Sequence, residues 1–490
     1  MKEIVTLQFG NLANYVSTQY WNIQDGYNLE SDNQNFEIYD TNALFQEGLS
    51  QNNSSTFTPR TLIFDLKENF GNLKSTSSDL YSEKQQNKDD YQYFENDVAK
   101  DIQESNTIVY ESTKPTKNRF LESFNPKFLA TSEINYFSDI NMVYYHPNSI
   151  HEVSGLVEGG SGTGQMSTFY QGQQVYDTMN KDMCFVDEDF RKLLEKCDDL
   201  QGIQIISDAY GGFSGFRNNF MEDIRSELPK KTLLVYSVSN LPTMNWKGMD
   251  TSDSAIGFAS CLDLQASFIP LYLPSQHNIS RNNVISELNM SYLYHSSAIQ
   301  SVFLDSLTVP LMTHGINLDD IIKKASVFNN ENFLVPKINM QLEGSNDLEN
   351  FGDSDQEFKY FDYVKKLSSS KNEKGIRKIN DDGWISARGK TFSKNADAFS
   401  SICEEYVCIE RGFEAPKSFP MELQNPYRSD GSKYNIISKL GGNDEDLGSY
   451  LDFMAKTLGE NREYNRVYGE DEIESIKEAI NVFSNECINK

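Results

Sequence analysis

The first thirty residues carry two hydrophobic patterns in succession, which predict a buried strand followed by a helix. A short apolar cluster comes first, at Ile4, Val5, Leu7 and Phe9, and Gly10 ends it. Apolar side chains then recur at intervals of three and four, at Leu12, Val16, Tyr20 and Ile23. The first pattern favours a strand, and the second is typical of one face of a helix. The chain therefore begins as strand, tight turn and helix.

Residues 61–66 predict a second strand. They read TLIFDL, so an apolar run ends on the carboxylate of Asp65. In an α/β sheet, ligands bind at the carboxyl ends of the strands. The sequence therefore makes Asp65 a candidate site residue.

The clearest crossover unit lies between residues 187 and 240. Asp187 can cap a helix with one apolar stripe, formed by Phe190, Leu193, Leu194, Cys197 and Leu200. A strand at 202–207 follows, then a glycine-rich turn, a helix that ends at Pro229, and a strand at 232–238. This order predicts a right-handed crossover between two parallel strands.

Two long polar stretches interrupt these patterns. Residues 67–127 are expected to be a flexible insertion, and residues 346–397 a linker. Near the end, residues 447–458 and 473–483 each predict an amphipathic helix. Core packing is the plain interpretation of both helices, and docking onto a partner is the alternative. We expect an α/β domain with a parallel sheet over residues 1–310, then a smaller α+β region with C-terminal helices over 311–490.

Composition excludes several classes of function. The 490 residues include 44 Lys and Arg against 72 Asp and Glu, a formal net charge of −28. This charge repels nucleic acid, so we expect no nucleic-acid binding through a basic patch. The six cysteines form no CxxC pair and the five histidines show no ligand spacing, so no metal site is expected. No run approaches the roughly 20 apolar residues of a transmembrane segment, and the first residues resemble neither a signal peptide nor a transit peptide.

The glycine-rich turn at residues 208–215, DAYGGFSG, is the first candidate binding site. Such a turn points backbone N–H groups and the positive end of a helix dipole at an anion above the sheet. An ordinary connecting turn is the alternative. No GxxxxGK[ST] motif occurs, which excludes an ordinary P-loop NTPase. The run GGSGTG at 159–164 lacks a convincing preceding strand and is expected to be a flexible loop.

Three segments, in order, resemble tubulin. MKEIVTLQFGNLANYVSTQYWNIQ resembles the tubulin N-terminus, TFTPRTLIFDL its second strand, and CDDLQGIQIISDAYGGFSGF the segment whose glycine loop holds the GTP phosphates. LTVPLMTHGINLDDII resembles the end of tubulin's central helix. The likeness implies a tubulin-like, Rossmann-type nucleotide-binding domain. It implies these phosphate-side residues: Gly10, Asn11, Asp65, Asp208, Gly211, Gly212, Ser214 and Gly215.

The phosphate loops depart from tubulin at several positions. After Gly10, the residues Asn11, Leu12 and Ala13 replace Gln-Cys-Gly, and a Cβ at Ala13 crowds a site that needs bare backbone. Phe213 stands where tubulin has a small Thr. These changes predict a phosphate cradle whose edges are filled.

The residues for turnover depart too. Lys67 replaces the acidic residue near magnesium, with Glu68 one step along, and Ser296 falls near the Asn that reads guanine. Residues 344–350 are only a faint candidate for the catalytic loop. A site without its water-positioning acid and base reader is not expected to hydrolyse GTP. We therefore expect no catalytic residues, and GTP or GDP with magnesium bound weakly, structurally or not at all.

Other segments resemble the Misato family in particular. They are LFQEG at 44–48, an aromatic-SD segment at 137–139 followed by HPxSI at 146–150, and a QG pair at 171–172. DAYGGFSGF, with Asp208 and Phe213, also follows the Misato pattern. His146 is expected to be a turn residue satisfied by backbone. Asp208 is expected to order its loop by accepting N–H groups, with ligand contact as the alternative, and Asp65 is the candidate on the magnesium side.

The Misato resemblance implies a function in mitochondrial inheritance, because its fungal members act there. We expect a non-catalytic protein that partitions mitochondria and mitochondrial DNA, at the mitochondrion on its periphery or outer surface, with a cytoplasmic pool as a second location. Its partners would be proteins at mitochondria or the cytoskeleton. An active GTPase that assembles into tubulin-like filaments is one alternative. An assembly cofactor for cytoskeletal proteins is the other.

Overall fold

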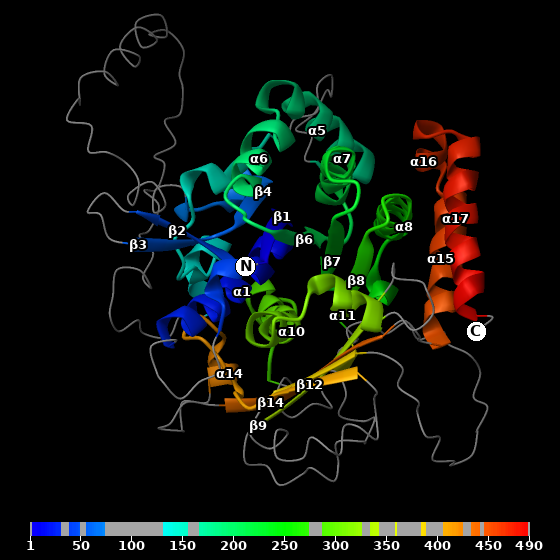
Figure 1. The fold of residues 1–490 in the computed structure, drawn as a ribbon. Helices are drawn as coiled ribbons and strands as arrows, with labels where there is room; N and C mark the ends of the chain where they lie inside the picture. The colour runs from blue at the N-terminus through cyan, green and yellow to red at the C-terminus, as the bar shows by residue number, and fades with distance from the viewer. Residues whose placement is uncertain are drawn as a thin grey trace, which may run out of the picture.

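Six parallel strands form the central sheet (Figure 1). The computed structural model describes residues 2–30, 39–49, 55–73, 131–154, 166–273, 287–325, 334–342, 358–359, 384–388, 405–424, 433–441 and 445–488. The strand order is β5-β4-β1-β6-β7-β8. The strands are β1 Glu3–Phe9, β4 Thr61–Leu66, β5 Ile150–Val153, β6 Leu200–Asp208, β7 Thr232–Ser239 and β8 Ser267–Tyr272. The four strands predicted from the sequence are confirmed, and the α/β fold with them.

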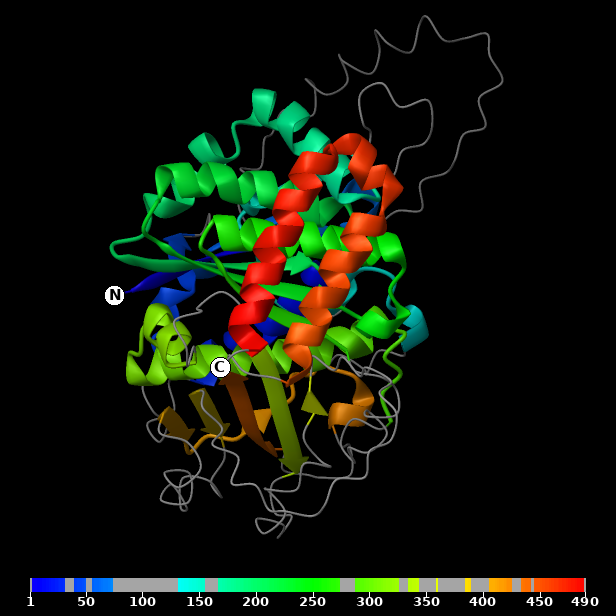
Figure 2. The same ribbon diagram turned by 90° about the vertical axis from the view of Figure 1, so that its right-hand side faces the viewer.

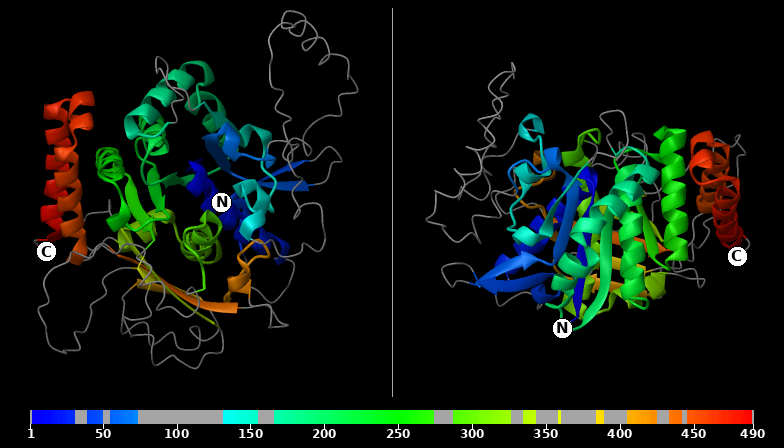
Figure 3. Two further views of the ribbon diagram at one scale, coloured as in Figure 1. Left: turned by 180° about the vertical axis from the view of Figure 1, so that it is seen from behind. Right: turned by 90° about the horizontal axis from the view of Figure 1, so that it is seen from above.

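Helices cover both faces of this sheet (Figures 1 and 3). One face carries α5 Phe169–Met183, α6 Arg191–Leu194, α7 Gly212–Glu227 and α8 Gly248–Asp263; the other carries α1 Asn11–Glu30, α10 Leu293–His314 and α11 Leu318–Ala325. Successive residues of a strand point to opposite faces. Val5, Leu7 and Phe9 of β1 therefore join the core under α7, while Ile4 joins the core under α1 and α10.

A second, mixed sheet lies beyond α10 (Figure 1). Its order is β10-β9-β14-β11-β12, with β13 paired to β14. The strands are β9 Val335–Leu342, β10 Phe358–Lys359, β11 Trp384–Arg388, β12 Glu405–Ile409, β13 Phe413–Glu414 and β14 Lys433–Gly441. β11 pairs with β12 in parallel, and the other pairs are antiparallel. Trp384 and Ile436 share one core with α1 and α10, so this sheet covers the side of α10 that faces away from the parallel sheet.

The predicted linker at 346–397 is wrong where it includes β11. Trp384–Arg388 form a fully buried strand, held by β14 on one side and β12 on the other. Its five residues are too few to show a period, and both partners lie elsewhere in the sequence. β10 also falls within the predicted linker. The other residues of 346–397 lie outside the described part of the chain.

The C-terminal helices form a hairpin that stands against α8 (Figure 2). It consists of α15 Glu445–Glu460, the short α16 Arg462–Val467 and α17 Glu470–Ile488. Leu451, Met454 and Ile480 are buried in the same core as Phe258 of α8. Core packing, the plain interpretation of these helices, is confirmed. Over the described residues, no helix combines the length and apolar character that crossing a bilayer requires.

Two other local predictions are corrected. Leu200 does not extend the helix near Asp187, because that helical segment stops at Leu194 and Leu200 begins β6. The polar insertion does not start at residue 67, because Phe70 and Leu73 are buried in the core. Residues 74–127 lie outside the described part of the chain. The remaining short strands are β2 Phe45–Leu49 and β3 Ser55–Pro59, and the remaining short α-helix is α14 Met421–Gln424.

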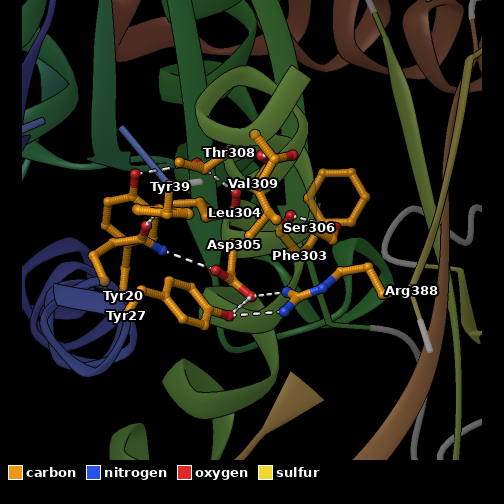
Figure 4. Close-up of polar contacts among 12 residues, drawn as sticks. Tyr20, Tyr27, Tyr39, Phe303, Leu304, Asp305, Ser306, Thr308, Val309 and Arg388 are labelled. Carbon is orange, nitrogen blue, oxygen red and sulfur yellow. Dashed lines mark hydrogen bonds and ion pairs between the residues drawn. The ribbon is translucent and has the colours of Figure 1, made fainter. Parts of the chain in front are cut away.

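A buried ion pair joins α10 to the second sheet (Figure 4). Arg388 of β11 donates from Nη1 to Oδ2 of Asp305 on α10, and both side chains are completely buried. Arg388 also donates from Nη2 to the Tyr27 hydroxyl at 2.8 Å, and this hydroxyl donates to Asp305 at 3.0 Å. On the other carboxylate oxygen, Gln24 of α1 donates at 2.8 Å. One carboxylate thus joins α1, α10 and β11.

Candidate functional site

The three candidate loops meet at the carboxyl ends of β1, β4 and β6, where the strand order reverses. Gly10 lies between β1 and α1, Asp65 lies in β4, and Gly211 lies between β6 and α7. Gly10 has φ +101°, a conformation that side chains rarely adopt, and its N–H donates to the Phe64 carbonyl at 3.1 Å. The structure therefore brings together Gly10, Asp65 and Gly211, which lie far apart in the sequence.

The carboxyl group of Asp208 occupies the start of α1. Its Oδ1 accepts the backbone N–H of Ala13 at 2.8 Å. A Cβ on Gly10 would collide with this carboxyl group, so glycine is required there to admit Asp208. Asp208 thus takes the N–H groups with which the first turn of a helix could hold an anion. It orders the β1–α1 turn rather than its own loop.

Burial dominates the electrostatics of Asp208. It raises the pKa of the carboxyl to about 8, and the nearby Asp65 adds to the rise. Hydrogen bonds from the backbone N–H groups of Ala13, Leu12 and Asn11 oppose it. A phosphate group is anionic. When Asp208 is ionised, its carboxylate therefore repels a phosphate at this position.

Asp65 is fully buried, and its oxygens accept amide hydrogens. Oδ2 accepts from Asn14 at 2.8 Å, and Oδ1 accepts from the Asn69 side chain at 2.7 Å and from the Leu66 N–H at 2.8 Å. Burial raises the pKa of this carboxyl to about 6, while the Asn69 and Asn14 hydrogen bonds oppose the rise. Within the described residues, no group of three or more His, Cys, Asp or Glu side chains is arranged to hold a metal.

A third buried carboxyl, Asp253 of α8, holds the glycine loop. Oδ2 accepts the N–H of Gly211 at 2.9 Å, and Oδ1 accepts the N–H of Phe169, the first residue of α5, at 3.3 Å. The Tyr464 hydroxyl of α16 donates to Oδ1 as well. Burial raises the pKa of Asp253 to about 7. The chain's own carboxyls therefore accept one N–H group at the start of each of α1, α5 and α7, those of Ala13, Phe169 and Gly211.

The other glycines of the loop pack against the start of α5 and against Met166, three residues before it. A Cβ on Gly212 would overlap Met166, and one on Gly215 would overlap the carbonyl of Phe169. Ser214 is 1% exposed and Phe213 is 8% exposed, within the core. Asn11 begins α1 and is partly exposed. Gly212 and Gly215 thus pack α7 against α5, a role that strand–turn–helix spacing does not distinguish from phosphate binding.

The segments that resemble the Misato family also have structural roles. His146 caps a short 3₁₀ turn by accepting the N–H of Asn148 at Nδ1, 3.2 Å away, so its interpretation as a turn residue is confirmed. Gln171 closes the capping box of α5 with Thr168. Asp139 accepts the N–H groups of Asn135 and Tyr136, each at 2.9 Å.

Several sequence predictions can be placed, and others cannot. Ser296 is buried in α10 and donates to the Leu293 carbonyl at 3.1 Å. Residues 159–164 and 344–350 lie outside the described part of the chain. Sequence reasoning missed Asp253 and Tyr464. The available signal for Asp253 was a carboxylate inside TSDSAIGFAS, a run of small and apolar residues that predicts a buried helix.

The pKa of Asp208 predicts how stability depends on pH. The folded protein holds this proton up to about pH 8, far above the ordinary value of 3.8. Its contribution to folding is therefore complete below pH 3.8 and is lost as pH rises toward 8. Between pH 6 and 8, the free energy of unfolding should fall relative to Asp208→Asn by up to about 1.4 kcal/mol per pH unit. Urea unfolding from pH 6 to 9 measures this.

Asp65→Asn is the control for that experiment. The folded pKa of Asp65 is about 6, so the difference between this variant and the wild type should level off near pH 6. If the wild type and Asp208→Asn keep a constant difference from pH 6 to 8, Asp208 does not titrate in this range and the prediction fails.

Comparison with known proteins identifies the family. The model of the Misato Segment II tubulin-like domain matches residues 2–125, and the tubulin domain model matches residues 126–312. Protein DML1 of Gibberella zeae is 28% identical over 323 residues, covering 63% of this chain and 60% of the relative. Protein dml1 of Aspergillus clavatus is 27% identical over 506 aligned positions, covering 97% and 95%. Protein misato of Drosophila melanogaster is 26% identical over 346 residues, covering 63% and 59%.

The matches agree with the fold described above. The two family models match residues 2–312, and the matched region spans about three-fifths of the first relatives' length. The two family models together cover the parallel sheet and α10, nearly to its end. On these findings the chain belongs to the Misato family of tubulin-like proteins.

Proposed function

We propose that this chain is a non-catalytic tubulin-like scaffold that acts in the inheritance of mitochondria and mitochondrial DNA. The observation that carries the non-catalytic part is the Asp208 carboxyl on the N–H of Ala13. A nucleotide phosphate would need the same first turn of α1. The fold is thus kept, while one donor of that turn, the Ala13 N–H, is already bound by the chain itself.

The neighbouring groups support this proposal. Asp65, the candidate on the magnesium side, is bound by Asn14, Asn69 and Leu66. Asp253 takes the N–H of Gly211. A phosphate or a magnesium ion would therefore have to displace buried hydrogen bonds, and breaking such bonds without replacement costs about 1–3 kcal/mol each.

Nucleotide content tests the non-catalytic proposal. The purified protein should release no guanine nucleotide after acid denaturation, and it should neither hydrolyse GTP nor form pelletable polymer as its concentration rises. Tubulin, assayed in parallel, is the positive control. Release of GTP or GDP near one mole per mole of protein would overturn the filled-site argument. Concentration-dependent hydrolysis with polymer would favour the filament-forming GTPase instead.

The proposed role in mitochondrial inheritance rests on membership in the Misato family, because fungal members of that family act in this process. We place the protein at the mitochondrial surface, with protein partners there or on the cytoskeleton. Depletion should produce daughter cells that lack mitochondria or mitochondrial DNA, scored by a matrix-targeted fluorescent protein and DNA staining. Re-expression of the wild type is the control. Normal partitioning after complete depletion, or a tagged copy that never meets mitochondria, would contradict this role.

A further inference from the structure

The C-terminal hairpin reaches the glycine loop through its tip. α16 connects the ends of α15 and α17 and lies beside α8 (Figures 1 and 2). Tyr464 of α16 is 2% exposed, and its hydroxyl donates to Asp253, the carboxyl that also accepts the Gly211 and Phe169 N–H groups. One buried carboxyl thus connects the C-terminal tip to the starts of α5 and α7.

Other contacts fix the same tip. Asn461 caps α16 and donates to Ser252 of α8 at 3.0 Å. The Tyr468 hydroxyl donates to Gln173 of α5 at 2.7 Å. The rings of Tyr464 and Tyr468 stack, with centroids 5.7 Å apart. The tip therefore contacts α8 and α5 by polar groups, while the bodies of α15 and α17 contact the core by apolar ones.

We propose that α16 is a strap that controls the conformation of the glycine loop through Asp253. With the strap closed, Tyr464 holds the Asp253 carboxyl against the Gly211 and Phe169 N–H groups. With the strap released, Asp253 loses a buried donor and these N–H groups lose a fixed acceptor. Because coupling between two sites is reciprocal, a protein that binds the hairpin tip also shifts the loop. This inference is independent of nucleotide content.

Hydrogen exchange tests the strap. Tyr464→Phe removes only the hydroxyl on Asp253, and Tyr468→Phe is the matched control because it removes a hydroxyl from Gln173 instead. Amide exchange of the full chain is measured by mass spectrometry with fragmentation that resolves Gly211. Exchange at Gly211 should accelerate about tenfold or more in Tyr464→Phe, because Asp253, once it is no longer held by the Tyr464 hydroxyl, stops fixing the Gly211 N–H. Tyr468→Phe should leave it within about threefold.

Two results would overturn the proposal. One is unchanged protection of Gly211 in Tyr464→Phe. The other is equal acceleration in both variants, which would mean that α16 acts by general packing and not through Asp253. If Tyr464→Phe fails to fold, Asp253→Asn tests the same link at the carboxyl itself: an amide has one acceptor oxygen in place of two, so exchange at Gly211 or Phe169 should accelerate in this variant. No change there would also overturn the proposal.

Discussion

Replacing Arg388 by methionine is expected to lower the free energy of unfolding by about 3–5 kcal/mol. The substitution leaves the Asp305 carboxylate completely buried without its cation, with donors only from Tyr27 and Gln24 among the contacts described above. A buried charge that loses its partner keeps its full desolvation cost. Guanidinium unfolding, followed by circular dichroism, measures the change.

The double variant Asp305→Leu/Arg388→Met is the control. Replacing both charges by apolar groups of similar size removes the unpaired carboxylate, so most of the lost stability should return. Tyr27→Phe should cost less than Arg388→Met, because the ion pair between Asp305 and Arg388 remains in place. A loss below about 1 kcal/mol in Arg388→Met would mean that Asp305 is not buried as described.

The local elements were predictable because their signals are local. β1 and α1 follow from apolar positions within two dozen residues, and Gly10 marks the turn between them. Likewise, β6, α7 and β7 follow from one crossover pattern. Sequence patterns therefore predicted most of the parallel sheet and the helices that border the candidate site.

The second sheet was not predictable in the same way. β11 pairs with strands centred about 20 and 50 residues further along, and its Arg388 contacts Asp305 and Tyr27 in other elements. Such pairing depends on the assembled core and leaves no period in a five-residue segment. The segments that resemble tubulin also end before the second sheet begins.

The site was predicted by its residues but not by their partners. Asp208 and Ala13 are 195 positions apart, and Asp253 and Tyr464 are 211 apart. The sequence indicated that Asp208 accepts N–H groups, but it could not indicate that the first turn of α1 supplies them. The same limit applies to glycines, because a phosphate loop and a close helix contact both require a missing Cβ.

Gly172→Ala should destabilise the protein by about 3 kcal/mol or more. Gly172 belongs to the QG pair of α5, and a Cβ there would overlap the carbonyl group of Gly212, the first residue of α7. Backbone cannot move aside as a flexible side chain can, so α5 and α7 must separate. That separation also disturbs the Asp253 contacts at the starts of both helices. Thermal and urea unfolding measure the loss.

Gly26→Ala is the matched control, because Gly26 lies inside α1 and a Cβ there meets nothing within 4 Å. Alanine is the better helix former, so this variant should gain up to about 1 kcal/mol. The same substitution in two helices should thus have opposite signs. If Gly172→Ala also proved neutral or stabilising, α5 and α7 would not be in backbone contact. The glycines of the loop would then be free to serve a ligand, and helix packing would no longer explain why these positions are glycine.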